Sequence, residues 1–271
     1  AGGAWSPIGD VTTTMLWIGG QISSSGIIQS TFLPSVVCML VPLLFLNFTL
    51  KGELGTRSSA GSQAGEMKSS NLMLLLGLSV LMAVPVFKTV THLPPYVGML
   101  FGLGILWVVS ELINPDADES IRKHYTAAHA LSKIDMPSVL FFLGILLAVG
   151  ALQSMALLSS FAAYLDQALG DNRIIITLIG VLSSIVDNVP LVAASMGMYS
   201  LGTYPMDHMI WEYLAYCAGT GGSLLVIGSA AGVAAMGMEK IDFIWYVKKI
   251  SLLALMGYAG GAVVYLLMHS F

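Results

Sequence analysis

Several long segments of the chain have no charged side chain, and these segments limit its possible folds more than any other feature. Residues 11–50 include no Asp, Glu, Lys, Arg or His, and shorter segments of this kind cover residues 71–87, 93–110, 136–165 and 213–238. A helix of about 20 apolar residues crosses the hydrocarbon core of a bilayer. Because the segments follow one another closely, the sequence predicts an all-α polytopic membrane protein whose partner is the lipid bilayer.

The composition agrees with this prediction. Of the 271 residues, 56% are hydrophobic and 10% are charged, whereas soluble domains have about 25% charged residues. The two cysteines, Cys38 and Cys217, both lie inside apolar segments, so they predict neither a disulfide framework nor a metal cluster. We expect no resident cofactor and no nucleic-acid partner.

Polar segments divide the chain into three predicted parts. Residues 1–50 are expected to hold a broken helix and a span, residues 51–71 a cytoplasmic linker rich in Ser and Gly, and residues 72–271 a longer unit. When the spans are threaded in order, Lys88 and Arg173 fall on one side and the other nine Lys and Arg residues on the opposite side. The side with nine is therefore predicted to be cytoplasmic, and the C-terminus periplasmic.

One apolar segment is too short to cross a bilayer. Residues 173–186 form 14 residues of helix at most, which span about 21 Å of a hydrocarbon core that is about 30 Å thick. The polar residues Asp187 and Asn188 follow, and Pro190 comes just after them. We therefore predict a re-entrant hairpin over residues 173–203 with its tip near the membrane centre, where irregular backbone must be buried in protein or line a wet cavity. The alternative is a turn at the membrane surface.

The start of the chain is repeated 219 residues later. Residues 2–10 align without gaps with residues 221–229, and both segments read Gly-Gly, then Ile-Gly, then a polar residue. Such glycines weaken a membrane helix, so each copy predicts a helix break: one within residues 1–50, and one in a broken helix over 209–238 that precedes a last span at 243–268. The threading inverts one unit relative to the other, as in many secondary transporters. Chance recurrence in a glycine-rich chain is the alternative.

Two carboxylates, Asp10 and Asp187, lie at the predicted breaks within apolar surroundings. A carboxylate inside a membrane is a candidate functional group, and hard cations such as sodium prefer oxygen ligands. Glu212 is instead expected near the outer interface. The candidate ion-binding residues are Asp10, Thr12 and Thr13 at the first break, Ser183, Asp187 and Asn188 at the hairpin tip, and Ser223 and Ser229 at the second break.

Three stretches resemble the NhaD-type sodium/proton antiporters, within the ion transporter superfamily that also contains arsenite and dicarboxylate carriers. They are AGGAWSPIGDVTTTMLWIGG, SSIVDNVPLVAASMG and AGTGGSLLVIGSAAGVAAMG. The resemblance implies an inverted-repeat ion transporter fold with discontinuous helices and a re-entrant helical hairpin. It also implies exchange of cytoplasmic Na⁺ or Li⁺ for external H⁺ across a bacterial inner membrane, the site residues named above, and a homodimer. A full-length member has further spans before the Ala-Gly-Gly motif, so this chain is expected to correspond to the C-terminal two-thirds of one.

Other functions remain open at this point. The nearest alternative is a sodium-coupled carboxylate or oxyanion carrier on the same scaffold, although two buried aspartates disfavour an anion site. An intramembrane protease is disfavoured because Asp10 follows Pro7-Ile8-Gly9 rather than Gly-x-Gly, and because Gly-x-Ser-Gly is absent around Ser223. A channel is conceivable, but inverted repeats favour alternating access. The sequence therefore predicts a transporter and not an enzyme.

Overall fold

The computed structural model describes residues 1–49, 70–113, 131–132, 134 and 136–270, and the regular structure within these residues is α-helical. Four of these helices are long and apolar enough to cross a membrane, and a fifth span results if the bent pair α7 and α8 is taken as one. The protein is thus an all-α multi-pass membrane protein, as the sequence predicted. The helices are α1 (Val11–Ile18), α2 (Ser24–Thr49), α3 (Ser70–Thr91), α4 (Pro95–Ile113), α7 (Met136–Ser154), α8 (Leu157–Leu169), α9 (Asn172–Leu182), α10 (Asn188–Met198), α11 (Met209–Gly221), α12 (Ala230–Glu239), α13 (Phe243–Lys249) and α14 (Ser251–Met268).

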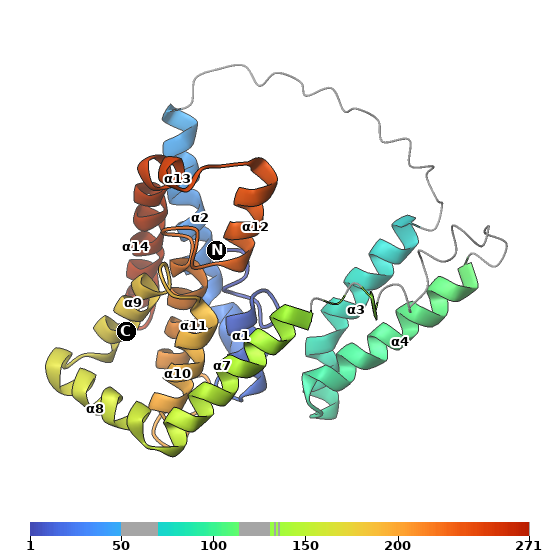
Figure 1. The fold of residues 1–271 in the computed structure, drawn as a ribbon, viewed down its shortest axis with the longest axis horizontal. Helices are drawn as coiled ribbons and strands as arrows, with labels where there is room; N and C mark the ends of the chain where they lie inside the picture. The colour runs from blue at the N-terminus through green and yellow to red at the C-terminus, as the bar shows by residue number, and fades with distance from the viewer. Residues whose placement is uncertain (50–69, 114–130, 133, 135, 271) are drawn as a thin grey trace. The chain divides into compact units, whose positions relative to one another are not determined.

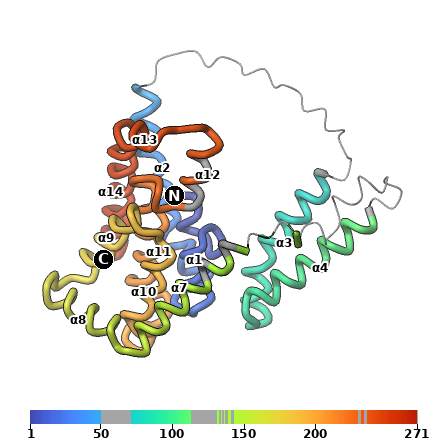
Figure 2. Tube along the Cα trace, viewed as in Figure 1, coloured from blue at the N-terminus to red at the C-terminus, as the bar shows by residue number. Residues whose placement is uncertain are grey.

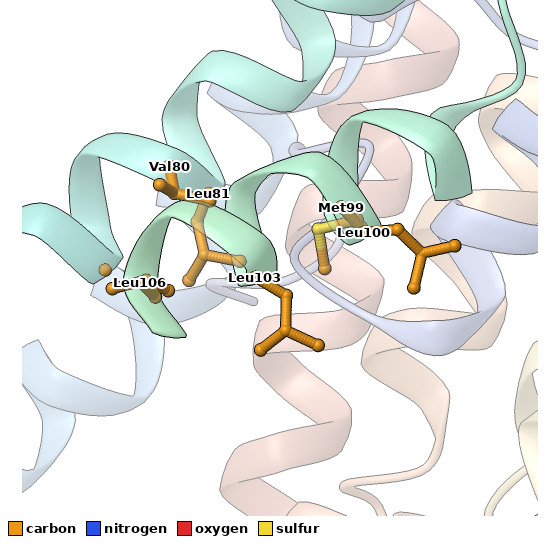
Figure 3. Close-up of a pocket in the computed structure, with 7 residues that line it drawn as sticks. Val80, Leu81, Met99, Leu100, Leu103 and Leu106 are labelled. Atoms are coloured by element: carbon orange, nitrogen blue, oxygen red, sulfur yellow. The ribbon is translucent and has the colours of Figure 1, made fainter. Parts of the chain in front are cut away.

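The helices belong to two compact units, residues 52–140 and residues 1–51 with 141–271 (Figure 1). The first of these contains α3 and α4, which pack on each other. Gly98 permits their close approach, since a Cβ there would lie 2.8 Å from the Phe87 ring. A pocket of about 330 Å³ between them has an apolar lining, which suits contact with lipid and offers no ion ligand (Figure 3). The predicted linker at 51–71 and the polar loop after α4 fall almost entirely outside the described residues.

In the larger unit, α2 and α14 form the most extensive helix contact (Figure 1). They run antiparallel, because Gly257 lies against Cys38 and Pro42 whereas Gly261, further along α14, lies against Pro34, earlier in α2. The sequence repeat makes α2 and α14 equivalent, so their antiparallel packing agrees with an inverted pair of units. Small residues at the contact let the two backbones approach, as is usual between membrane helices.

We expect Gly261→Ala to destabilise the protein by about 1–3 kcal/mol, because the added methyl group would overlap packed atoms. A Cβ at Gly261 would lie 2.5 Å from the Pro34 carbonyl oxygen and would also meet the Tyr216 hydroxyl. The neighbouring Gly260 is a matched control, since its Cβ would make ordinary contacts at 3.5 Å or more. Thermal unfolding in detergent tests this, and equal melting temperatures for the two alanine variants would contradict it.

The chain turns back on itself between α9 and α10. The two helices are separated by residues 183–187, and both of their outer ends reach Tyr204. The Asn172 side chain at the start of α9 donates to the Tyr204 hydroxyl at 2.8 Å, and the Tyr199 ring after α10 packs edge-on against the Tyr204 ring. Two short helices with neighbouring outer ends and a common tip have the shape of a helical hairpin.

The two helix breaks have the same local geometry. In the first break a Cβ on Gly3 would lie 2.7 Å from the Gly9 carbonyl oxygen, and at the equivalent position of the second break a Cβ on Gly222 would lie 2.7 Å from the Gly228 carbonyl oxygen. Each break therefore needs glycine where its two ends approach each other. Figure 2 follows the second break as the chain leaves α11 and enters α12.

Each break also ends at an extended polar residue that begins a short helix. Asp10 precedes α1 with φ −143°, and Ser229 precedes α12 with φ −136°. These positions are equivalent in the sequence repeat, so the two copies share a backbone conformation as well as a residue pattern. Both residue types are favoured at this position because their side-chain oxygens can accept from backbone N–H groups.

The expected last span at 243–268 differs from the structure, which divides it into α13 and α14. Asp242 caps α13 by accepting from the backbone N–H of Trp245 at 3.2 Å, and Lys248 and Lys249 end that helix. Charged residues at both ends favour a short helix in an aqueous or interfacial setting, so the apolar span begins only at Ser251. Similarly, the segment after α7 bends by 74° and continues as α8.

Candidate functional site

The hairpin tip lies between the two helix breaks. Helices α1, α10 and α11 pack on one another, and α9 packs along α11. As a result, the start of α10 approaches the first break, while the end of α9 approaches the second. This arrangement brings together residues that are far apart in the sequence.

Asp10 is the carboxylate at the centre of the first break. Its Oδ2 accepts from the Thr12 hydroxyl at 2.5 Å and from the Asn188 side-chain amide at 3.2 Å. Its backbone carbonyl accepts from the hydroxyls of Thr13 and Thr14, both at 2.9 Å. Thr12 and Thr13 are fully buried. The first break and the hairpin tip are therefore joined directly through Asp10 and Asn188.

The hairpin tip contributes Asp187, Asn188 and Ser183. Asp187 begins α10, and its Oδ1 accepts from the backbone N–H of Val189 at 3.4 Å. Pro190 sits in the first turn of α10, where its missing N–H is tolerated. Asn188 is buried, whereas Asp187 keeps partial exposure. A carboxylate that is held by its own helix and is partly exposed remains accessible to a cation.

Ser183 connects the tip to the second break. Its hydroxyl donates to the Gly180 carbonyl at 2.7 Å and approaches the Ala218 carbonyl of α11 at 3.4 Å. The packing here leaves no room for side chains, because a Cβ on Gly221 would strike the Gly180 carbonyl and one on Gly228 would strike the Ser183 carbonyl. Backbone thus packs directly on backbone where α9 meets the second break.

The two serines of the second break are placed differently from the other site residues. Ser223 is exposed, and its hydroxyl donates to the Thr220 carbonyl at 2.6 Å. Tyr246 of α13 donates to the Ser223 carbonyl at 2.7 Å. Ser229 caps α12 by accepting from the Gly232 N–H at 3.4 Å. Neither serine bonds Asp10 or Asp187, so the structure brings together mainly the first break and the hairpin tip.

Electrostatic features of the site come from carboxylates and helix ends. Among the described residues, neither Asp10 nor Asp187 forms an ion pair with Lys, Arg or His, and no group of three His, Cys, Asp or Glu side chains forms a cluster. The N-termini of α1 and α12 lie at the breaks and that of α10 at the hairpin tip, and each carries a partial positive charge. The C-termini of α9 and α11 end there too, and the negative ends of their dipoles favour a cation. The donor set is thus made of oxygens, which suits a hard cation.

The sequence also matches a known family of transporters. The sequence model of the family CitMHS, described as citrate transporter, matches residues 1–221. The chain belongs to this transporter family. Relatives include sodium/proton antiporter 1 of Arabidopsis thaliana, which is 50% identical over the whole chain and 47% of the relative's length, and sodium/proton antiporter 2 of the same plant, which is 46% identical over the whole chain and 65% of its length.

The bacterial relatives include the Na⁺/H⁺ antiporter NhaD of Vibrio cholerae, which is 31% identical over 99% of this chain and 59% of its own length. The resemblance to NhaD antiporters is therefore confirmed, and these relatives are named as antiporters or transporters rather than enzymes. The chain spans about half to two-thirds of the length of these CitMHS-family relatives. No solved structure matches it significantly.

Sequence reasoning missed two features of the site in this CitMHS-family chain. Gly219 of α11 lies beside the first break, since a Cβ there would be 3.7 Å from Asp10 Oδ2 and 3.3 Å from the Ala4 side chain. Gly180 lies against α11 near the hairpin tip. Both are single glycines within apolar helices, and such a glycine is itself a signal of close backbone approach. Only the fold shows which backbone segment approaches each of these glycines.

The oxygen donors predict that this site binds a cation, and we expect Asn188→Ala to weaken such binding about tenfold, because a lost hydrogen bond to a charged group costs about 1.5 kcal/mol. The variant removes the amide that donates to Asp10 from the hairpin tip. Asn172→Ala is a matched control, because that amide bonds Tyr204 at the opposite end of the hairpin. The apparent affinity for Na⁺ in an exchange assay is the measurement. If the two variants had the same affinity, the Asn188 contact would have no role in binding.

Proposed function

We propose that the protein is a secondary active transporter that exchanges Na⁺ or Li⁺ for H⁺ across its membrane. The observation that carries this proposal is the Asp10 carboxylate, which is bonded by Asn188 of the hairpin tip and has no ion-pair partner among the described residues. An intramembrane carboxylate of this kind holds either a proton or a cation, and competition between the two for one group is sufficient for antiport.

In the proposed site, Asp10 and Asp187 carry the negative charge, and neighbouring oxygens complete the cation's coordination. Thr12 and Asn188 are already bonded to Asp10. The carbonyl oxygens at the ends of α9 and α11 already accept hydrogen bonds, such as those from Ser183 to Gly180 and from Ser223 to Thr220, and the second lone pair of each oxygen offers a further ligand. The proposed ion-binding residues are Asp10, Thr12, Thr13, Ser183, Asp187, Asn188, Ser223 and Ser229. We give the two serines of the second break a supporting role, because their side chains form hydrogen bonds within the break itself and thereby hold its backbone in place.

We also propose an inverted-repeat mechanism. Residues 1–50 would form the end of the first repeat and residues 72–271 the second, with the hairpin and both breaks moving as a transport unit. The equivalent geometry of the breaks and the antiparallel packing of α2 and α14 support this proposal. Three features stay predictions: the homodimer, the periplasmic C-terminus and the location in a bacterial inner membrane. The kind of membrane is not assigned, because the relatives come from both bacteria and a plant.

A carboxylate carrier is the second candidate, because the matching family is described as citrate transporter. Three helix N-termini at the breaks could also attract an anion. The unpaired Asp10 argues against an anion that binds alone, since two negative charges would repel each other at close range. A sodium ion held by Asp10 could still accompany a carboxylate substrate, so transport must be measured with both kinds of ion.

A transport assay on the complete gene product in everted vesicles from antiporter-deficient cells tests the proposal. The account predicts that Na⁺ or Li⁺ collapses a preformed proton gradient, that K⁺ or choline does not, and that Asp187→Asn removes the effect. Collapse that survives Asp187→Asn would exclude the proposed role of Asp187. Citrate uptake that depends on Na⁺, without cation-dependent collapse, would favour the carrier.

A further inference from the structure

A second buried carboxylate lies outside the proposed ion-binding site. Glu212, which the sequence predicted near the outer interface, is in the first turn of α11 and is only 4% exposed. Its helix is enclosed on all sides, since residues 210–218 are all buried. The side chain therefore cannot extend along a lipid-facing surface to water, as long charged side chains do at span ends. A carboxylate enclosed in this way is a functional candidate.

Two side chains from the end of α14 face Glu212. The Tyr265 hydroxyl lies 3.3 Å from Glu212 Oε2, and His269 Nε2 lies 3.6 Å from the same oxygen. The Tyr265 and His269 rings are stacked at 4.2 Å, which fixes the imidazole. The His269 side chain is 25% exposed, whereas that of Glu212 is 5% exposed. The pair therefore joins a buried acid to the aqueous surface at the C-terminal end of α14.

The tautomer of His269 follows from its second nitrogen. His269 Nδ1 lies 2.9 Å from the Tyr265 backbone carbonyl, which has no proton to give, so Nδ1 must carry the hydrogen and donate it. Nε2 is then the nitrogen that gains and loses a proton, and it is the one that faces Glu212. Proton transfer along this contact converts imidazolium and carboxylate into neutral imidazole and carboxylic acid.

The surroundings favour a proton over a metal cation. The side chains facing Glu212 are an imidazole and the Tyr265 hydroxyl, which also donates to the Met209 carbonyl at 3.0 Å, whereas a sodium site needs several oxygen acceptors. Asp207 adds a negative charge nearby, and Ser30 of α2 lies close to the carboxylate. The remaining ionisable groups on the elements packed around α11, capping residues included, are Asp10, Cys38, Asp171, Arg173, Asp187, Tyr199, His208, Tyr213, Tyr216, Cys217 and Tyr258. None of these forms an ion pair with Glu212 in the described part of the chain.

We propose that Glu212 and His269 form a proton-binding site, separate from the cation site, through which protons enter from the aqueous side at the C-terminal end of α14. The proposal rests on the proposed cation–proton exchange for its role in transport. Glu212 lies about seven residues, or roughly 10 Å, along α11 from Gly219, and Gly219 lies beside Asp10. A proton held at Glu212 is therefore two turns of one helix away from the carboxylate that must receive it.

Infrared difference spectroscopy of the purified complete protein, between acid and alkaline pH, tests the proton site without any transport. We expect a carboxylic-acid band that Glu212→Gln removes and that saturating Na⁺ leaves unchanged. His269→Gln should move the midpoint of this band upward by about one pH unit, because the variant removes a neighbouring positive charge. Glu239→Gln and His92→Gln, which alter exposed residues, are the matched controls.

Several outcomes would overturn the proposal. If Glu212→Gln removed no band at any pH, the pair would be a permanent ion pair with a structural role only. A Glu212 band that disappears on addition of Na⁺ would make this a cation site. In exchange assays, Glu212→Gln should lower the turnover on the order of tenfold without changing the apparent affinity for Na⁺. Failure of cation–proton exchange itself would appear separately, as an inactive wild-type protein whose Glu212 band is still present.

Discussion

Asp10→Asn is expected to lower sodium-dependent proton exchange on the order of a hundredfold or more. The amide has the shape of the carboxylate and can still accept from the Thr12 hydroxyl, which donates to Asp10 Oδ2. It cannot, however, bind a proton at working pH, and it offers a cation no negative charge. The loss therefore comes from the chemistry of the group and not from packing, and the variant should fold normally.

Asp242→Asn provides the control for this variant. Asp242 also begins a short helix and accepts from a backbone N–H, but it is exposed and lies at α13. Exchange is measured in proteoliposomes with an internal pH-sensitive dye after a pulse of Na⁺. The account predicts wild-type exchange for Asp242→Asn and almost none for Asp10→Asn. An Asp10→Asn variant that keeps more than about a tenth of the activity would exclude Asp10 as the exchanging group.

Gly228→Ala is expected to have the second-largest effect, through the backbone of the site. A Cβ at Gly228 would strike the Ser183 carbonyl oxygen and come within 2.8 Å of the Ser184 carbonyl carbon. These are backbone atoms of the hairpin tip, so they can move only if the tip itself shifts away from the second break. We expect a loss of stability of about 1–3 kcal/mol and a loss of exchange of about tenfold or more, since misplaced ligands bind poorly.

Gly237→Ala is the matched control, because a Cβ there would meet nothing within 4 Å. Gly237 lies inside α12, where alanine is the better helix former. Thermal unfolding and exchange should both stay at wild-type values or rise slightly. If Gly228→Ala behaved like Gly237→Ala, the close packing of the hairpin tip on the second break would not be needed for transport.

The membrane spans were predictable because each depends on local sequence alone. The segments without charge at residues 71–87 and 93–110 correspond to α3 and α4, whose ends lie within four residues of them. The positions of the two breaks could also be predicted, because glycines that recur at a fixed spacing indicate places where the backbone approaches too closely for a Cβ atom. The division of the last span at Ile250 was missed, since the apolar residues of α13 conceal the effect of Asp242 and Lys249.

Contacts between distant segments could not be predicted in this way. The bond between Asp10 and Asn188 depends on how α1 packs on α10. The sequence alone also does not show that Tyr265 and His269 lie against Glu212 and cover it. Ser223 was grouped with the site by analogy between the repeats, but its hydroxyl is used within its own turn. Side-chain direction inside an irregular break has no sequence periodicity from which it can be read.

The central claim is that one carboxylate-centred site binds either a proton or a cation. Proton release on cation binding tests this most directly, with the purified complete protein in weakly buffered detergent solution and a pH indicator. The account predicts that adding Na⁺ or Li⁺, but not choline, releases protons from the wild-type protein and from Asp242→Asn, and releases none from Asp10→Asn. If Na⁺ released no protons from the wild-type protein, or if Asp10→Asn released as many, the claim would be contradicted.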